Sequence, residues 1–355
     1  MMSKRSLKEL RKGLSPNFCL IPFTTIILEP DGKVGICRNK GDNFPIGNIK
    51  DRPLNDIWDI RNSPKAQQWR KEFLENNPII CHDEVTHRKC HLEYGFNTLA
   101  QEAELKVKQE GKILRLTANL NGQCNLRCPF CTVWQSPNGN YTEENFWEPA
   151  REILFPFLKE IDMLGGEPLI QADTYRLIKE VSSCNPNCQW FFTTNMAWTI
   201  NAKLEKLLDL IEINILTVSL DSLVPTTYEV LRPPAKLSKI LNNLEKVLEY
   251  NKRRAKPFRL AINALFQKQN WQELPEMIRF CLKNDFALNP ILLKTPSLSS
   301  LLDFNNEEKK KILDFYFSEI EPAHFKLITP IVIPLIEKLP RIDKAYYYQE
   351  LKRTT

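Results

Sequence analysis

The stretch ILRLTANLNGQCNLRCPFC, residues 113–131, joins an apolar run of β-type residues to a loop that carries three cysteines. Cys124, Cys128 and Cys131 follow the run in a C-x3-C-x2-C arrangement. Three thiols spaced so closely fit poorly on one regular element, whereas a loop can wrap them around a single soft metal centre. The stretch therefore predicts a strand with a metal-binding loop at its carboxyl end.

The residues that follow alternate between apolar strand-like runs and longer helical stretches. The runs cover 113–120, 160–165, 189–195, 212–220, 258–266 and 287–294, and the helices fall near 142–158, 172–183, 201–209, 236–252 and 271–284. This alternation predicts an α/β fold, a parallel sheet with helices outside it. Six units are two fewer than a full (β/α)8 barrel, so we expect a partial, TIM-like (β/α)6 barrel.

The two ends of the chain have other patterns. Residues 1–13 resemble a charged helix, and the turn Glu29-Pro30-Asp31-Gly32 joins strands at 22–28 and 33–37 into a predicted hairpin. A helix near 54–76, a polar linker at 98–111 and a mostly helical segment at 305–355 are also expected. We predict a small α+β domain at 14–97, the barrel at 112–300 and a helical extension at 301–355.

Composition narrows the functional class. The 355 residues carry a net charge of +6, and no apolar run is long enough for a membrane span. The basic N-terminus lacks the apolar core of a secretory signal, so we expect a cytoplasmic protein with no membrane partner.

Ten cysteines in a reducing compartment indicate metal or thiol chemistry. The basic run at 252–259 is interpreted as a solvated helix end, so we do not expect nucleic acid as a partner.

Two metals compete for the three clustered cysteines. Iron–sulfur clusters are held by cysteine thiolates, and a cubane with three protein ligands leaves one iron open to a cofactor or substrate. Zinc would need a fourth ligand, and structural zinc sites prefer C-x2-C pairs. The spacing favours the cluster.

This loop resembles the radical SAM superfamily, and three later motifs strengthen the resemblance. Phe130 gives the C-x3-C-x-aromatic-C form, and the second strand ends in Gly165-Gly166-Glu167-Pro168. The third strand ends in Thr193-Thr194-Asn195, and the fourth gives Ser219-Leu220-Asp221-Ser222 followed by Tyr228 and Arg232. Each motif stands where a strand ends, which is where barrel enzymes build their sites.

The resemblance implies a [4Fe–4S] cluster on Cys124, Cys128 and Cys131 whose open iron binds S-adenosylmethionine (SAM). Reductive cleavage of SAM would give a 5′-deoxyadenosyl radical that abstracts a substrate hydrogen. The other cofactor-binding candidates are Phe130 beside the adenine, the backbone at Gly165 and Gly166, and the residues Glu167, Pro168, Asn195, Ser219, Asp221 and Arg232. Arg232 is expected to pair with the SAM carboxylate, although Asp221 and Arg232 also fit a helix cap and an ion pair.

The N-terminal region resembles the SPASM/twitch auxiliary-cluster module. Cys19, Gly32 and Cys37 have its C-x12-G-x4-C spacing, and Ile46-Gly47-Asn48-Ile49 leads into a later Trp58 and Arg70. The resemblance implies that Cys19, Cys37, Cys81 and Cys90 ligate one auxiliary iron–sulfur cluster, expected to be [4Fe–4S]. In many relatives this module follows the barrel, whereas here it precedes it.

The last two auxiliary cysteines depart from the module's pattern. Eight residues separate Cys81 from Cys90 where the module commonly has a C-x2-C pair, and His82, His87 and His91 lie in or beside the insert. A histidine ligand, as in Rieske centres, and a zinc site both remain open.

We therefore expect a radical SAM oxidoreductase that carries out an oxidative or rearranging modification of a peptide or small metabolite. A fully protein-ligated auxiliary cluster would accept an electron from the substrate radical, and a flavodoxin or ferredoxin would reduce the first cluster. The alternatives are a tRNA- or RNA-modifying radical SAM enzyme and a non-catalytic cluster-bearing protein. Cys184, Cys188 and Cys281 are assigned no role, with Cys281 expected in the core.

Overall fold

The computed structural model describes residues 7–14, 18–38, 44–50, 54–77, 81, 97–136, 141 and 143–354 of the chain. Their strands follow one spatial order, β3-β2-β1-β4-β5-β6-β7-β8-β9. The bounds are β1 (Thr25–Leu28), β2 (Lys33–Gly35), β3 (Pro45–Asn48), β4 (Arg115–Ala118), β5 (Glu160–Met163), β6 (Gln189–Thr194), β7 (Glu212–Ser219), β8 (Arg259–Phe266) and β9 (Ala287–Leu292).

Thirteen α-helices lie within these described ranges. They are α1 (Leu7–Leu10), α2 (Ile21–Thr24), α3 (Ile57–Arg61), α4 (Pro64–Leu74), α5 (Glu144–Ile153), α6 (Ala172–Cys184), α7 (Ala202–Leu208), α8 (Pro225–Leu231), α9 (Leu237–Arg253), α10 (Leu274–Lys283), α11 (Asn306–Glu319), α12 (Phe325–Glu337) and α13 (Arg341–Thr354). No helix in this part of the chain is long and apolar enough to cross a membrane.

The chain divides into two compact units. The first comprises Met1–Cys124, Val133–Phe192 and Ala202–Asn214, and the second comprises Asn125–Thr132, Thr193–Asn201 and Ile215–Thr355. The cysteine loop therefore contributes residues to both units. Cys124 ends a segment of the first unit, while Cys128 and Cys131 belong to the second.

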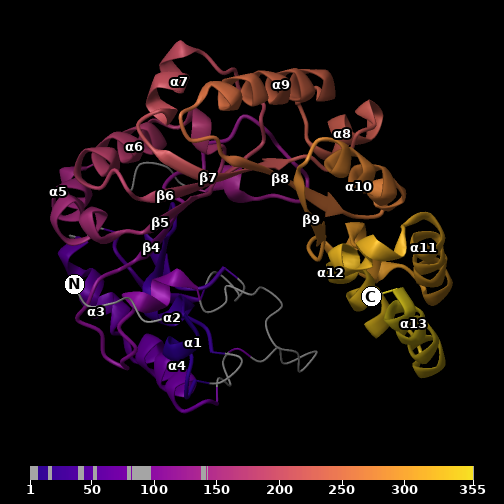
Figure 1. The fold of residues 1–355 in the computed structure, drawn as a ribbon, viewed down its shortest axis with the longest axis horizontal. Helices are drawn as coiled ribbons and strands as arrows, with labels where there is room; N and C mark the ends of the chain where they lie inside the picture. The colour runs from indigo at the N-terminus through magenta and orange to yellow at the C-terminus, as the bar shows by residue number, and fades with distance from the viewer. Residues whose placement is uncertain are drawn as a thin grey trace. The chain divides into compact units, whose positions relative to one another are not determined.

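In the first unit, strands β4, β5 and β6 run parallel, with Arg115 opposite Glu160 and Glu160 opposite Gln189. Alternate side chains of these strands, such as Leu116, Ile161 and Trp190, are fully buried, and helices α5 and α6 lie beside the strands (Figure 1). The N-terminal hairpin joins the same sheet, since β1 pairs antiparallel with β2 and parallel with β4.

In the second unit, β7, β8 and β9 continue the parallel pattern, with Ser219 opposite Asn263 and Asn263 opposite Asn289. Helix α10 buries Leu274, Met277, Ile278 and Cys281, a 3.6-residue spacing that makes one apolar stripe. Helix α12 packs against β9, and α11 begins with a capping box formed by Asn305 and Glu308.

The predicted α/β fold with six parallel strands of a partial barrel and a helical C-terminal region is confirmed. Three local expectations differ from the structure. Residues 21–24 form α2 rather than the start of a strand, the expected helix near 54–76 is interrupted at Asn62–Ser63, and α8 was not expected. Pro22 and Pro64 each stand at the first turn of a helix, where proline is well tolerated.

Candidate functional site

Two glycines follow β5 and lie directly against the loop that leads to Cys124. Gly165 has a φ of +80° and Gly166 a φ of +36°, a backbone region that residues with a Cβ rarely enter. A Cβ on Gly165 would lie 1.7 Å from Asn119 Oδ1, and one on Gly166 would lie 2.0 Å from the Gln123 carbonyl oxygen. The pair therefore lets β5 approach the residues immediately before the first cysteine.

Hydrogen bonds hold this close approach. The Glu167 backbone N–H donates to the Gln123 carbonyl at 2.9 Å. The buried Gln171 amide donates from Nε2 to the carbonyls of Asn121 and Gln123, at 3.0 and 2.8 Å. These contacts fix the backbone position from which Cys124 extends.

Glu167 is fully buried, and its carboxylate caps the short helix that follows it. Oε1 accepts from the Leu169 backbone N–H at 3.1 Å, and Pro168 is the first residue of that 3-10 helix, Pro168–Ile170. The structure thus gives Glu167 and Pro168 a role in shaping the turn after the two glycines.

Asn119 supplies an acceptor beside the same turn. Its Nδ2 donates to Glu29 Oε2 at 2.5 Å, while its Oδ1 is buried without a hydrogen-bond partner among the described residues. A buried polar atom without a partner is unusual and calls for a ligand or an unseen group. The Asn119 oxygen is therefore suited to receive a donor such as an ammonium group.

In the second unit, the loop carrying Cys128 and Cys131 is attached at several points. The Cys131 N–H donates to the Cys128 carbonyl at 3.1 Å, which closes a tight turn, and the Arg127 N–H donates to the Pro233 carbonyl at 2.7 Å. Asn195 Nδ2 donates to Asn125 Oδ1 at 2.9 Å. Asn195, expected to contact SAM, therefore also orients the cysteine loop.

Asp221 and Arg232 form a buried ion pair with two hydrogen bonds. Arg232 Nε donates to Asp221 Oδ2 at 2.7 Å, and Nη2 donates to Oδ1 at 3.1 Å. Burial alone would lower the pKa of Arg232, but the charges of Asp221 and Cys128 raise it by more than burial lowers it. The pKa therefore lies above its ordinary value, and the guanidinium stays charged. The pair uses two of the five N–H donors of Arg232, so Nη1 and the second N–H of Nη2 can reach another group. The guanidinium lies 5.6 Å from the centre of the half-buried Phe130 ring.

Ser219 is half-buried at the last position of β7. Its register partner on β8 is Asn263, whose Oδ1 accepts from Asn289 Nδ2 at 3.0 Å. Ser219 thus stands in a polar row at the end of its strand.

Three of the four auxiliary cysteines fall in the described part of the chain. Cys19, Cys37 and Cys81 are half-buried, and the buried indole of Trp69 donates from Nε1 to Cys81 Sγ at 3.1 Å. Cys90, His82, His87 and His91 lie outside the described residues. Within the described residues no three metal-binding side chains are gathered around one point.

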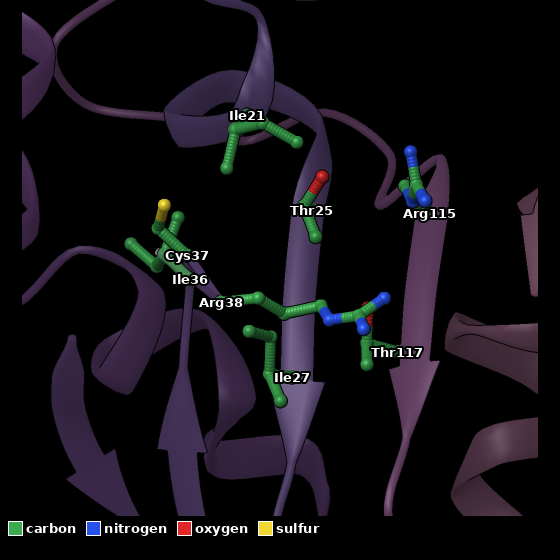
Figure 2. A pocket seen from close by; sticks show the side chains of 8 residues that line it. All are labelled: Ile21, Thr25, Ile27, Ile36, Cys37, Arg38, Arg115 and Thr117. Carbon is green, nitrogen blue, oxygen red and sulfur yellow. The ribbon is translucent and has the colours of Figure 1, made fainter. Parts of the chain in front are cut away.

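A small pocket lies beside Cys37 in the first unit. Figure 2 shows the Arg38 side chain reaching across β1 toward Thr117 on β4. Arg38 Nη1 lies 2.5 Å from Asp162 Oδ2, and Arg115 Nη1 lies 3.3 Å from Glu160 Oε2. Both cations are thus paired with carboxylates, and the rest of the pocket lining includes the apolar side chains of Ile21, Ile27 and Ile36.

The unassigned cysteines behave as core or surface residues. Burial raises the pKa of the Cys188 thiol and of the Cys281 thiol to about 12 in each case. Both side chains therefore stay protonated at neutral pH, while Cys184 is exposed at the end of α6.

Sequence reasoning missed the residues that hold the cysteine loop. Asn119, Gln123 and Gln171 were not singled out, although Asn119 follows β4 immediately and so occupies the strand-end position used to choose the other candidates. Gln171 carried no such signal, because its contacts depend on the path of the turn after the glycines.

We expect Asp221→Asn to destabilise the apo-protein by about 3 kcal/mol, because the change leaves the buried Arg232 charge without its partner. Urea unfolding measures the difference. The matched control is Asp303→Asn, which breaks the more exposed Lys268–Asp303 pair and should cost less than about 1 kcal/mol. Equal losses in both variants would contradict a special role for the buried pair.

Comparison with protein families identifies two domains in this chain. Residues 119–281 match the Radical SAM superfamily, and residues 19–91 match SPASM, an iron–sulfur cluster-binding domain. Both resemblances predicted from the cysteine spacing are thus confirmed, and iron–sulfur clusters and SAM are the cofactors that they imply.

Proteins similar in sequence to this chain include GTP 3′,8-cyclases. A Methanocaldococcus jannaschii protein named a probable GTP 3′,8-cyclase is 27% identical over 180 residues, covering 50% of this chain and 58% of that protein. The GTP 3′,8-cyclase of Clostridium perfringens is 25% identical over 229 residues, covering 59% of this chain and 67% of that protein. The chain thus spans little more than half of the first relative.

Among solved structures, Streptococcus suis SuiB bound to the precursor peptide SuiA is 19% identical to this chain. The match covers 58% of this chain and 46% of SuiB, with a TM-score of 0.44. A likeness at this level carries no argument about function.

Proposed function

This chain carries a radical SAM domain at residues 119–281 and a SPASM domain at residues 19–91, and from that premise we propose that it is a radical SAM oxidoreductase. The proposed reaction is an oxidative or rearranging modification of a peptide or small metabolite. We propose three domains, the auxiliary-cluster domain at 14–97, the partial barrel at 112–300 and the helical extension at 301–355.

The observation that carries the proposal is the way the segment before Cys124 is held. Two carbonyls of this segment accept hydrogen bonds from Gln171, and the Gly165-Gly166 turn presses against it at distances that exclude any side chain. A metal-binding loop needs ligands in fixed positions. These contacts support Cys124 as a ligand of a [4Fe–4S] cluster, and the C-x3-C-x2-C spacing supports Cys128 and Cys131 as the other two ligands.

The residues present also fit SAM. When bound, the cluster and SAM together supply radical chemistry that protein side chains cannot perform. The unpartnered Asn119 Oδ1 beside Gly165 would accept from the SAM ammonium, and Arg232 Nη1 would donate to its carboxylate while Asp221 holds the guanidinium in place. Phe130 would lie beside the adenine. Asn195 and Ser219 would make polar contacts to the ribose or the amino-acid moiety.

The substrate class is proposed as a peptide or small metabolite. The names of the relatives add GTP as a compound to test. An external electron donor such as a flavodoxin or ferredoxin is proposed as the reductant.

Anaerobic reconstitution tests the proposal. We expect about seven to eight irons per chain if both sites hold [4Fe–4S] clusters, and formation of 5′-deoxyadenosine from SAM after reduction with dithionite. A content of about four irons and one zinc per chain would instead indicate a zinc site in place of the auxiliary cluster. A fully loaded protein that leaves SAM intact would overturn the proposal.

The auxiliary cluster is proposed to accept an electron from the substrate radical. We therefore expect Cys37→Ala to retain reductive SAM cleavage but to lose substrate oxidation, because the cluster on Cys124, Cys128 and Cys131 remains. The yield of 5′-deoxyadenosine and of modified substrate, measured in one reaction, separates the two steps. Stoichiometric substrate oxidation by this variant would contradict the relay role.

A further inference from the structure

The indole of Trp69 donates a hydrogen bond to the sulfur of Cys81, and no step of the proposed function uses this bond. Trp69 lies on α4 with 1% of its surface exposed, and its Nε1 lies 3.1 Å from Cys81 Sγ. An indole N–H can only donate, and a neutral cysteine sulfur is a weak acceptor. Hydrogen bonds to charged acceptors are roughly twice as strong as those between neutral groups. The bond therefore suits a metal-bound thiolate at Cys81 better than a thiol.

Aromatic rings pack around this donor. The centre of the Trp69 ring lies 4.3 Å from that of Phe44 and 6.3 Å from that of Phe73, and the Phe73 ring lies 5.7 Å from that of Phe18. All three phenylalanines are buried. Apolar surroundings lower the local dielectric constant, so the hydrogen bond to sulfur is stronger here than it would be in water.

The residues beside the other two described auxiliary cysteines are also apolar. Phe18 precedes Cys19 and stacks on Phe23 with ring centres 5.3 Å apart, and Ile36, which precedes Cys37, is 0% exposed. The potential of an iron–sulfur cluster depends on its solvent exposure and on hydrogen bonds to its sulfurs. Half-buried thiols in apolar surroundings, one of them already accepting an N–H bond, therefore fit an auxiliary cluster.

We propose that Trp69 tunes the auxiliary cluster through its N–H···S hydrogen bond to Cys81. The inference rests on the proposed function, which gives the chain an auxiliary cluster with Cys81 among its expected ligands. Trp69 is a positioning residue, because it acts through Cys81. Since reduction adds negative charge to the cluster and its sulfurs, an N–H donor stabilises the reduced form and raises the reduction potential. A higher potential favours the proposed transfer of one electron from the substrate radical to this cluster.

Trp69→Phe removes the N–H and keeps an aromatic ring. The parent for this test is the full-length protein with Cys124→Ala, Cys128→Ala and Cys131→Ala, so that only the auxiliary cluster is reconstituted. At the midpoint potential of this parent, we expect Trp69→Phe to lower the ratio of reduced to oxidised cluster about tenfold, a shift of about 59 mV to more negative potential. An EPR redox titration measures the shift.

Isotopic labelling tests the contact itself. When tryptophan carries ¹⁵N at the indole nitrogen, the pulsed EPR spectrum of the reduced parent should show a ¹⁵N coupling, because the donor nitrogen is one hydrogen bond away from a ligand sulfur. The coupling should disappear in Trp69→Phe. A role of Trp69 in packing alone would not produce it.

Trp147→Phe is the matched control. Trp147 is 0% exposed, and its Nε1 donates to the Tyr141 carbonyl at 2.7 Å. This variant also removes a buried indole N–H bond, so it should lower the melting temperature as Trp69→Phe does. It should leave the midpoint potential and the ¹⁵N coupling unchanged.

Three results would overturn the inference. They are an unchanged potential in Trp69→Phe, an equal shift of potential in Trp147→Phe, and a labelled parent whose loaded cluster shows no ¹⁵N coupling. The last result is decisive even if Trp69→Phe folds poorly, because it needs no substitution at Trp69. A parent that binds no iron, or zinc instead of iron, would refute the auxiliary cluster of the proposed function, and this inference with it.

Discussion

Replacing Cys128 by alanine is expected to abolish SAM cleavage and to remove about four irons per chain. The side chain is 8% exposed, and the loss of one sulfur atom changes the packing little. A cluster with only two protein ligands would dissociate or lose the geometry that leaves one iron open. Iron analysis and 5′-deoxyadenosine formation measure the two effects, and Cys124→Ala and Cys131→Ala should behave alike.

Cys184→Ala is the control for this experiment. Cys184 is exposed at the end of α6, so its loss should leave both the iron content and SAM cleavage at wild-type levels. If Cys128→Ala kept its full iron content and its SAM cleavage, the assignment of the loop as the cluster site would be wrong.

Gly166→Ala should lower SAM cleavage by about 100-fold, because displacing a reacting group by about 1 Å can cost that much. The new Cβ would lie 2.0 Å from the Gln123 carbonyl oxygen and 2.6 Å from its carbon, and these are backbone atoms that cannot rotate away. Relief requires moving the residue that precedes Cys124. The rate of 5′-deoxyadenosine formation at saturating SAM, together with iron content, checks this expectation.

Gly13→Ala separates backbone strain from this clash. Gly13 also has a positive φ, +88°, but a Cβ there would meet nothing within 4 Å. This control should lower the free energy of unfolding only by the backbone strain, about 1–2 kcal/mol, and should leave SAM cleavage intact. A loss of cleavage that is equal in both variants would mean that the position of Gln123 does not matter.

Much of the fold could be predicted because strand and helix periodicity is local. The helical pattern near 271–284 predicted α10, and Cys281 was expected in the core, where it lies. The parallel pairing of β1 with β4 was not predicted, because Ile26 and Leu116 are opposite each other across 90 residues of sequence. Nothing in either strand's pattern names its partner.

The candidate site was predictable where spacing carries the chemistry. The cysteine spacing and the double glycine are sequence signals, and the glycines do have the positive φ that makes them necessary. The Asp221–Arg232 pair and the Asn195–Asn125 hydrogen bond join residues brought together by the fold. The sequence motifs therefore identified these side chains as candidates. Their hydrogen-bond partners could not be predicted, because tertiary structure determines them.

The parallel ladder between β1 and β4 has a consequence for any attempt to dissect the protein. Every residue of β1, from Thr25 to Leu28, is opposite a residue of β4, and the buried Arg61 side chain donates to the Thr25 carbonyl at 2.6 Å. A truncated chain starting after residue 111 would leave β4 as a bare sheet edge, open to pairing with other chains. The N-terminal module thus cannot be removed without exposing an edge of the sheet. A chimera that exchanges this module between homologues would have to exchange β4 as well.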